Sequence, residues 1–435
     1  MSGNITVKTI ACIESSNYGH RLQLMQETIK GILLAGNNAV CITDNTQPIQ
    51  AFIQDTLPEY YGKVTYYNYQ YLPYKAISWS TKLNDLLYSI HNWKQYQQVL
   101  KTVENKIKLK IDLVILHNID IFLCTLMPIA LQQVFFRYQW MAMYIHPRYL
   151  RMYKSIGVQE KRARISDIDY LFLSKKCKGV AVFDNGVQQG LQYRIQKKVS
   201  LLPDFSYVNL PKNNITWIDE IITQANGRTI VGTIGMNFYG GFVDMVKLAM
   251  YCQEKHPEFY FVCCGQFEEN IYAEITNKTD AALVRNFRQH PSDNCYWKEG
   301  YLADEPTYNA VFNTFDIIYM MYPHHYSSSN RLTKVAYFRK VVLATNQHCV
   351  GENVQQYGFG RVASPHNIEE QAQQLVLLAQ QLQEKRRSYH RYEEYYTNNS
   401  TQAFQAAIRI MLNVYCPLFS WNSNNVLVNN NGNNL

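Results

Sequence analysis

The residues from 327 to 334 combine helix-starting and cationic side chains, and this combination is the clearest chemical signal in the chain. Serine and asparagine are favoured where helices begin, and the apolar residues that follow here have helical spacing. A helix start offers free backbone N–H groups and the positive end of the helix dipole, which suit a phosphate group. An ordinary capped surface helix is the alternative explanation. The candidate phosphate-binding residues are Ser328, Ser329, Asn330, Arg331 and Lys334.

The position of this turn favours the phosphate-binding interpretation. It follows the apolar run from Asp316 to Met321, which is typical of a buried strand. Open α/β sheets bind their ligands at the carboxyl ends of strands, where this turn is expected to lie. Glu352 follows a second apolar run, Val341 to Ala344. Its carboxylate either hydrogen-bonds a sugar or caps the next helix.

Two histidines that follow expected strands are the candidate catalytic residues. His20 comes directly after Gly19 and before an amphipathic run. Imidazole exchanges a proton near neutral pH, so His20 suits a base that acts on a hydroxyl group. The alternative is a helix-start histidine that bonds nearby backbone. His146 precedes Pro147, at the end of a strand or in a turn, where it either lines a site or is structural.

Alternating strand-like and helix-like runs must position these residues. They indicate parallel sheets covered by helices on both faces. After a polar stretch from 209 to 214 the pattern restarts, and Gly235 ends the first strand-like run of the new series. We therefore predict an α/β chain with two Rossmann-like, doubly wound domains that face a central cleft. The expected strands are 7–13, 39–43, 112–116, 140–145, 179–183, 199–202, 229–235, 259–265, 316–321 and 341–344, and the expected helices are 21–34, 83–109, 242–252, 371–395 and 401–414.

These runs divide the chain into five parts. The expected parts are an amino-terminal Rossmann-like domain at 1–207, a linker at 208–228, a carboxyl-terminal Rossmann-like domain at 229–395, a helix at 396–421 that packs back on the first domain, and a disordered asparagine-rich tail at 422–435.

Composition limits the classes of function. The chain of 435 residues carries a net charge of +8 without a long block of lysine or arginine, which favours anionic ligands. We expect no nucleic-acid partner, because no reader motif accompanies the charge. The ten cysteines lack metal-ligand spacing, and the pair His324-His325 has no carboxylate cluster beside it, so no metal site is expected. The most apolar stretch, 113–136, is interrupted by polar residues, so it would make a poor spanning helix, and peripheral membrane contact stays open. The cysteines lie mainly in apolar runs, which favours reduced thiols and predicts a cytoplasmic protein.

Three motifs of the second half occur in an order that resembles retaining GT-B glycosyltransferases, especially glycosyltransferase family four. They are Gly232-Thr233-Ile234-Gly235, Cys264-Gly265-Gln266-Phe267 and the segment from Tyr322 to Asn367. The resemblance implies that the domain at 1–207 binds the acceptor and that the domain at 229–395 binds the nucleotide-sugar. It also implies that Gly19, His20 and His146 lie at the cleft between the domains. It also implies that a nucleotide-sugar diphosphate binds at Ser328 to Lys334, with Gly235 beside it. It further implies transfer of the sugar to a hydroxyl acceptor, such as a glycan or a lipid-linked molecule, with retained configuration and without a required cofactor.

The chain departs from that family at its charged positions. Two glutamates separated by seven residues are common in the family, and Tyr326 and Lys334 occupy the matching positions. An arginine–lysine pair that usually follows the first strand of the second domain is replaced by the stretch from Gly235 to Gly241. We therefore expect a divergent glycosyltransferase. The alternatives are a non-catalytic nucleotide- or sugar-binding protein on the same scaffold and, with less support, a nucleotide-sugar epimerase.

Overall fold

The computed structural model describes residues 7–16, 19–76, 80–152, 160–302, 304–323, 325–384 and 391–415. His324, Cys416 and the expected tail at 422–435 lie outside these ranges. The chain forms two compact units. The first unit contains residues 1–143, 171–180 and 405–435, and the second contains residues 144–170 and 181–404. The domain boundaries drawn from the sequence remain a prediction.

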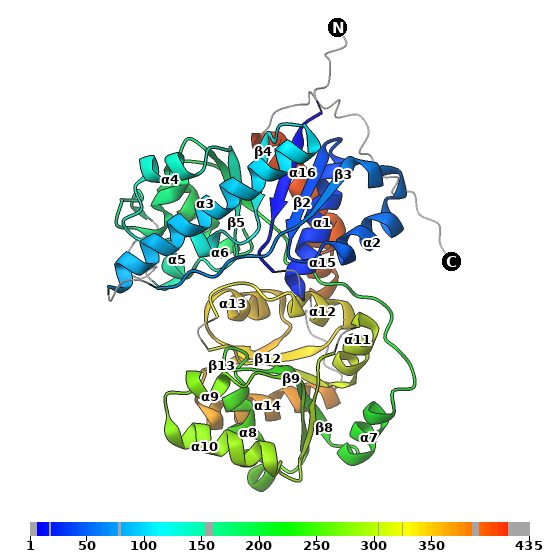
Figure 1. Ribbon diagram of the computed structural model, residues 1–435. Helices are drawn as coiled ribbons and strands as arrows, with labels where there is room; N and C mark the ends of the chain where they lie inside the picture. Colours follow the sequence, from blue (N-terminus) through cyan, green and yellow to red (C-terminus); the bar gives the residue numbers. More distant parts are fainter. Residues whose placement is uncertain are drawn as a thin grey trace. The chain divides into compact units, whose positions relative to one another are not determined.

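Each of the two sheets has the strand order of a doubly wound fold, with neighbouring strands parallel (Figure 1). The order is β3-β2-β1-β4-β5-β6-β7 in the first sheet and β10-β9-β8-β11-β12-β13 in the second. The strands of the first sheet are β1 (Thr9–Ile13), β2 (Asn38–Thr43), β3 (Val64–Asn68), β4 (Leu113–Leu116), β5 (Trp140–Tyr144), β6 (Cys177–Val182) and β7 (Val199–Leu201). Those of the second are β8 (Thr229–Met236), β9 (Phe259–Phe267), β10 (Cys295–Glu299), β11 (Ile317–Met320), β12 (Val341–Thr345) and β13 (Gly360–Ala363).

Helices connect successive strands. Up to residue 201 they are α1 (His20–Leu34), α2 (Gln47–Thr56), α3 (Thr81–Ile107), α4 (Ile129–Phe135), α5 (Arg148–Met152) and α6 (Asn185–Ile195), with short 3₁₀ turns η1 (Pro58–Lys63), η2 (Ile119–Phe122) and η5 (Ile168–Leu173). They continue with α7 (Thr216–Ala225), α8 (Phe242–Lys255), α9 (Ile271–Glu274), α10 (Lys278–Gln289), α11 (Glu305–Thr314), α12 (Arg331–Phe338), α13 (His348–Tyr357), α14 (Ile368–Gln383), α15 (Tyr392–Asn398) and α16 (Thr401–Tyr415).

The second sheet is buried on both faces because its strands are almost continuously apolar. Successive side chains of a strand point to opposite faces. Accordingly, Phe261 and Cys263 of β9 pack with helices α8, α10 and α14, whereas Tyr260 and Val262 pack with α7, α11, α12 and α13. Figure 1 shows α11, α12 and α13 on one side of this sheet and α8, α10 and α14 on the other. The expectation of two doubly wound α/β sheets is confirmed.

In the first unit, α16 lies against α1. A methyl group added at Gly31 would come 2.9 Å from Cγ2 of Ile408, so the glycine allows the two helices to approach closely. The side-chain amide of Gln405 also donates a hydrogen bond to Glu27 at 2.5 Å.

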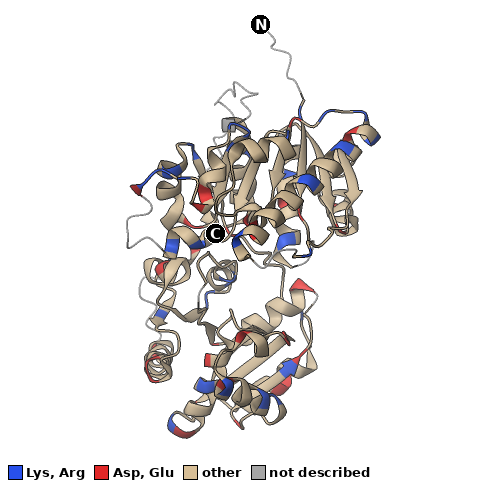
Figure 2. Ribbon diagram, turned by 60° about the vertical axis from the view of Figure 1, so that its left-hand side comes forward, with Lys and Arg blue, Asp and Glu red and all other residues tan. Residues whose placement is uncertain are grey.

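Charged residues are spread along the chain without one block of a single sign, as Figure 2 shows. The charge distribution therefore does not by itself mark a site.

Candidate functional site

The candidate site lies where the strand order of the second sheet reverses. The chain leaves β8 toward β9 on one side and returns at β11 on the other, so the carboxyl ends of β8 and β11 form a topological switch point. Ligands of open α/β sheets bind at such points. Gly235, near the end of β8, has a φ of +88° and sits within an irregularity of the β8–β9 pairing. A side chain there would be strained, and a Cβ would lie 3.4 Å from Nη2 of Arg331.

Arg331 places its guanidinium at this switch point. It is the first residue of α12, and its Nη1 donates to the hydroxyl of Tyr322 at 3.1 Å. Its Nη2 donates to the carbonyl oxygen of Ile234 in β8. Among the residues that the structure describes, no carboxylate lies within ion-pair distance of this guanidinium. A half-buried cation whose partners are neutral oxygens retains the capacity to bind an anion.

The serines of the turn serve mainly to hold the turn in place. The hydroxyl of Ser328 donates to Oδ2 of Asp204 at 2.5 Å, and that of Ser327 donates to the carbonyl oxygen of Ile145 at 2.7 Å. Ser329 and Asn330 precede α12, which has no side-chain cap. Within the described part of the chain, the backbone N–H groups of Ser329, Asn330 and Arg331 have no acceptor. The donors that this turn leaves without a partner in the described ranges are therefore backbone N–H groups rather than the hydroxyls of Ser327 and Ser328.

Lys334 lies one turn further along α12, and its ammonium group is already satisfied. Nζ donates to Oε2 of Glu305 at 2.7 Å, to Oδ1 of Asn309 at 2.6 Å and to the carbonyl oxygen of Tyr207 at 2.6 Å. These three acceptors use all three N–H donors of an ammonium group. Burial lowers the pKa of Lys334 and Glu305 opposes that effect. The structure thus brings Arg331 alone of the two predicted cations to the switch point.

Glu352 forms an ion pair rather than capping a helix. Helix α13 begins at His348, so Glu352 lies inside it and the expected cap is wrong. Its two carboxylate oxygens accept hydrogen bonds from Nη1 and Nη2 of Arg151 at 2.7 and 2.8 Å. Arg151 also binds the buried carboxylate of Asp184, with Nε to Oδ2 at 2.6 Å. Its partner Arg151 could not be found from the sequence, because the two residues are 201 positions apart.

The structure brings His146 near the serine turn through His325. The rings of His146 and His325 are 6.3 Å apart in an edge-on arrangement. His325 lies between Tyr322, with ring centroids 5.2 Å apart, and the carbonyl oxygen of Ser328, 2.9 Å from Nε2. Burial lowers the pKa of His325, which favours the neutral ring that donates to this carbonyl. His146 itself is exposed and follows β5, and its predicted role remains a prediction.

Gly19 and His20 lie at the start of α1 in the first unit. Gly19 is exposed with a φ of +57°, and no atom lies within 4 Å of a Cβ added there. The ring Nδ1 of His20 lies 3.3 Å from Oε1 of Gln23, one turn along the helix. This contact orients the imidazole and leaves the predicted acid–base role as a prediction.

Tyr322 and Tyr326 are functional candidates that the sequence reasoning did not single out. Tyr322 follows β11 and contacts Arg331 through its hydroxyl. The ring of Tyr326 lies 4.6 Å from that of His348, which has a φ of +54° at the carboxyl end of β12. The available signal was their position, because each aromatic residue follows a buried strand of the second sheet.

Two further properties bear on the class of protein. In the described ranges, no group of three or more histidine, cysteine, aspartate or glutamate side chains is arranged to hold a metal ion. Nor does any helix in those ranges have both the length and the apolar character needed to cross a membrane.

Two doubly wound sheets with these strand orders define the fold of the GT-B glycosyltransferases. No protein-family model matches the chain, and no curated protein matches its sequence. Its structure is similar to a glycosyltransferase from Rickettsia africae, with a TM-score of 0.54, 14% identity and coverage of 95% of this chain and 98% of the other. It is also similar to Anabaena HepE in complex with UDP and glucose, with a TM-score of 0.58, 11% identity and coverage of 93% and 99%. An alpha,alpha-trehalose-phosphate synthase (UDP-forming) from Burkholderia vietnamiensis gives a TM-score of 0.63, 10% identity and coverage of 95% and 100%. At such low identities the similarity shows the fold alone.

Proposed function

We propose that the protein is a glycosyltransferase that moves a sugar from a nucleotide-sugar donor to an acceptor hydroxyl. The observation that carries this proposal is the guanidinium of Arg331, which lies at the switch point of the second sheet without a carboxylate partner among the described residues. The free N–H groups at the start of α12 add to its attraction for a diphosphate. Solved structures of the same fold contain UDP with glucose, or belong to a UDP-forming synthase, which makes a uridine nucleotide the first donor to test.

In the proposed reaction, an acceptor oxygen forms a bond to the anomeric carbon while the bond from that carbon to the diphosphate breaks. The acceptor hydroxyl loses its proton, and the nucleoside diphosphate leaves with the electron pair. Arg331 would stabilise the negative charge that develops on the leaving diphosphate. His20 and His146 are the proposed groups on the acceptor side. The resemblance to family four supports retention of the anomeric configuration, with a glycan or a lipid-linked molecule as acceptor. The basic net charge supports peripheral contact of a cytoplasmic protein with an anionic membrane surface.

The proposed reaction needs no metal ion, because Arg331 and the start of α12 can neutralise phosphate charge. Turnover is therefore expected to survive exhaustive treatment with EDTA. A complete loss of transfer that a divalent cation restores would contradict this part of the proposal.

The nucleotide site is tested by calorimetric titration of UDP into the wild type and into Arg331→Ala, after a thermal-shift comparison of nucleoside diphosphates. Charge-assisted hydrogen bonds contribute about 1.5–3 kcal/mol each, so the variant should bind UDP about tenfold to 100-fold more weakly. Arg285→Ala is the matched control, because Arg285 is an exposed arginine on α10 of the same unit. Equal UDP affinity in the wild type and in Arg331→Ala would remove Arg331 from the site.

A non-catalytic nucleotide- or sugar-binding protein is the second candidate, and the environment of Lys334 favours it. Where the family resemblance expects a carboxylate, this chain has a lysine that is bound to Glu305, Asn309 and Tyr207. Product analysis with the sugar donors of the bound nucleotide separates the two. Transfer to an acceptor supports the enzyme, and donor binding without transfer or hydrolysis supports the binding protein. Release of an epimerised sugar would identify the less supported third alternative.

A further inference from the structure

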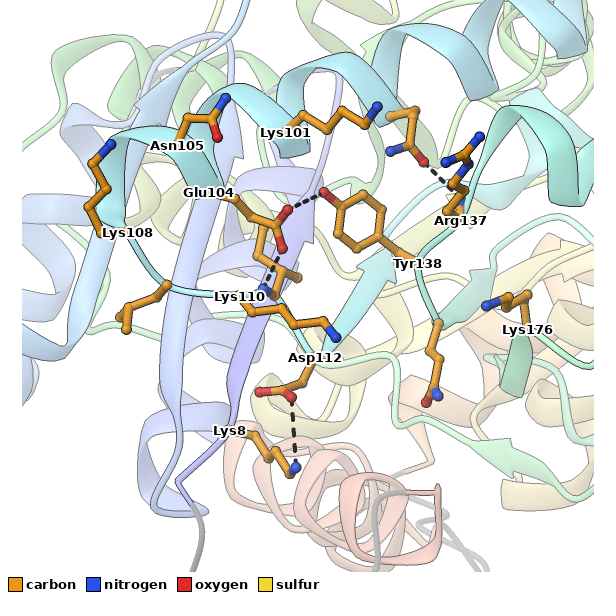
Figure 3. A pocket seen from close by; sticks show the side chains of 14 residues that line it. Lys8, Lys101, Glu104, Asn105, Lys108, Lys110, Asp112, Arg137, Tyr138 and Lys176 are labelled. Atoms are coloured by element: carbon orange, nitrogen blue, oxygen red, sulfur yellow. Dashed lines mark hydrogen bonds and ion pairs between the residues drawn. The ribbon is translucent and has the colours of Figure 1, made fainter.

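A cavity of about 970 Å³ lies at the amino ends of strands of the first sheet (Figure 3). His20 lies beyond the carboxyl end of β1, at the opposite end of these strands. Its walls come from the last turns of α3, from the residues just before β1 and β4, and from the loops that precede β5 and β6. Ligand pockets commonly have volumes of about 300–1,000 Å³. The cationic residues that line it are Lys8, Lys101, Lys108, Lys110, Arg137 and Lys176.

The two carboxylates of the lining are used by the protein itself. Glu104 accepts hydrogen bonds from the backbone N–H of Ile111 and from the hydroxyl of Tyr138, each at 2.7 Å. Asp112 accepts from the backbone N–H of Thr9 at 3.0 Å and lies 3.7 Å from the ammonium group of Lys8. The carboxylates thus hold the walls of the cavity together, and Asp112 pairs with Lys8.

The other cations have no such partner. Figure 3 draws no interaction to the ammonium groups of Lys101, Lys108, Lys110 and Lys176. In the described ranges no carboxylate lies within 4 Å of these four groups or of the guanidinium of Arg137. A lysine near the carboxyl end of a helix is explained by the helix dipole alone. That explanation covers Lys108, the C-cap residue of α3, but Lys110, Arg137 and Lys176 belong to three other segments.

Like charges that line one cavity repel one another, and a bound anion would relieve that repulsion. Tyr138 is the one aromatic residue among those that line the cavity, and its hydroxyl is engaged by Glu104. Recognition by charge is therefore better supported than recognition by stacking on a base. We propose that this cavity is a binding site for a compact polyanion that carries two or more phosphoryl groups, held by Lys101, Lys110, Arg137 and Lys176.

This site is separate from the proposed reaction. β1 and β4 have five and four residues, and a strand rises about 3.3 Å per residue. The cavity is thus roughly 13–17 Å, the length of these strands, from their carboxyl ends. The inference does not depend on glycosyl transfer, since its test measures binding. Phosphoryl groups reach such a site either on a soluble molecule or on a lipid headgroup, and the experiment distinguishes these sources.

The test titrates inorganic tripolyphosphate into the full-length protein by calorimetry. Wild type is compared with the double variant Lys110→Gln, Lys176→Gln. The control is Lys75→Gln, Lys175→Gln, which removes the same charge from two exposed lysines outside the cavity. The cavity variant should bind tripolyphosphate at least about tenfold more weakly than the control, because two charge-assisted contacts are lost. Arg331→Ala is titrated in parallel, because tripolyphosphate can also bind the proposed nucleotide site. This variant lacks the arginine of the nucleotide site and keeps every residue of the cavity.

A second arm measures sedimentation with phosphatidylcholine vesicles that contain or lack phosphatidic acid. Binding to phosphatidic acid that depends on Lys110 and Lys176 would identify a lipid headgroup as the source of the phosphoryl groups. Binding of tripolyphosphate alone, with the same dependence, would identify a soluble ligand. If the cavity variant and the control bind both probes equally, or if wild type binds neither, the proposed site is refuted.

Discussion

The ammonium group of Lys334 lies 2.7 Å from the carboxylate of Glu305, whereas the guanidinium of Arg331, three positions earlier, has no carboxylate partner among the described residues. Both side chains leave the first turns of α12, yet they have different surroundings. Lys334 is buried against α11 and the backbone of Tyr207, and Arg331 reaches the switch point of the sheet. One cation therefore stabilises the fold, and the other has only neutral oxygens as partners among the described residues.

Replacement of Lys334 should reduce stability rather than nucleotide affinity. In Lys334→Met, the carboxylate of Glu305 and the amide oxygen of Asn309 lose their shared donor. Removal of one partner of a buried charged network costs about 2–4 kcal/mol. Chemical denaturation should show this loss, and calorimetry under native conditions should give a UDP affinity close to that of the wild type.

The double variant Lys334→Met, Glu305→Met serves as the control for this prediction. It removes the stranded carboxylate together with its partner, so it should recover part of the lost stability. If Lys334→Met is as stable as the wild type but binds UDP more weakly, Lys334 belongs to the nucleotide site.

Substitution of Gly235 should affect the nucleotide site beyond its effect on the backbone. Gly235→Ala places a methyl group at a φ of +88° and 3.4 Å from Nη2 of Arg331. The strained backbone costs about 1–2 kcal/mol. Gly227→Ala is a matched control, because Gly227 has a φ of +78° and no atom within 4 Å of an added Cβ. Both variants should lose similar stability in thermal unfolding, and only Gly235→Ala should bind UDP more weakly. An equal UDP affinity in the two would show that Gly235 serves the backbone alone.

The strands that the sequence did not reveal are the edges of the sheets. β3, β10 and β13 were not expected, and each lies at an end of its sheet. Their residues are mostly half-buried, whereas β1, β4, β11 and β12 are buried throughout. Edge strands that face solvent need no continuous apolar run, so hydrophobic periodicity finds the central strands and misses β3, β10 and β13, although it does find the edge strand β7.

The site was predictable only where it depends on local sequence. The turn before α12 and its position after β11 follow from residues that are near one another in the chain. The hydrogen-bond partners of Lys334 and Ser328 cannot be read from nearby residues. Glu305 lies 29 positions from Lys334, and Asp204 lies 124 positions from Ser328. Whether a cation binds a ligand or a neighbouring carboxylate is decided by such distant contacts. The role of Arg331 relative to Lys334 therefore required the structure.

His20 provides a test that separates an enzyme from a binding protein. If its imidazole deprotonates or orients an acceptor hydroxyl, His20→Ala should lower the rate of sugar transfer by about 10²–10⁴-fold and leave UDP affinity unchanged. Steady-state transfer assays and calorimetry on the same preparation give both values. Circular dichroism and thermal unfolding establish that the variant is folded. Gln23→Ala removes the contact at 3.3 Å that orients the ring, so it should cause a smaller loss of transfer. A folded His20→Ala that transfers at the wild-type rate would assign His20 a structural role.

The buried histidine His117 should make the stability of the protein depend on pH. This histidine follows β4, is 1% exposed, and neither ring nitrogen has a hydrogen-bond partner in the described part of the chain. Burial lowers its pKa from 6.5 to about 3. Because the unfolded chain takes up a proton below pH 6.5 and the native ring does not, the native state loses stability as the pH falls from 6.5 toward 3.

Replacement of this imidazole should remove that dependence. One proton corresponds to about 1.4 kcal/mol per pH unit, so between pH 7 and pH 5 the free energy of unfolding of the wild type should fall by about 2 kcal/mol more than that of His117→Leu. Urea titrations at several pH values measure the difference. His117→Phe alters the packing differently but also lacks the titrating group, so it should give the same pH slope as His117→Leu. Parallel pH profiles for the wild type and both variants would show that the buried ring takes up its proton as readily in the native state as in the unfolded chain.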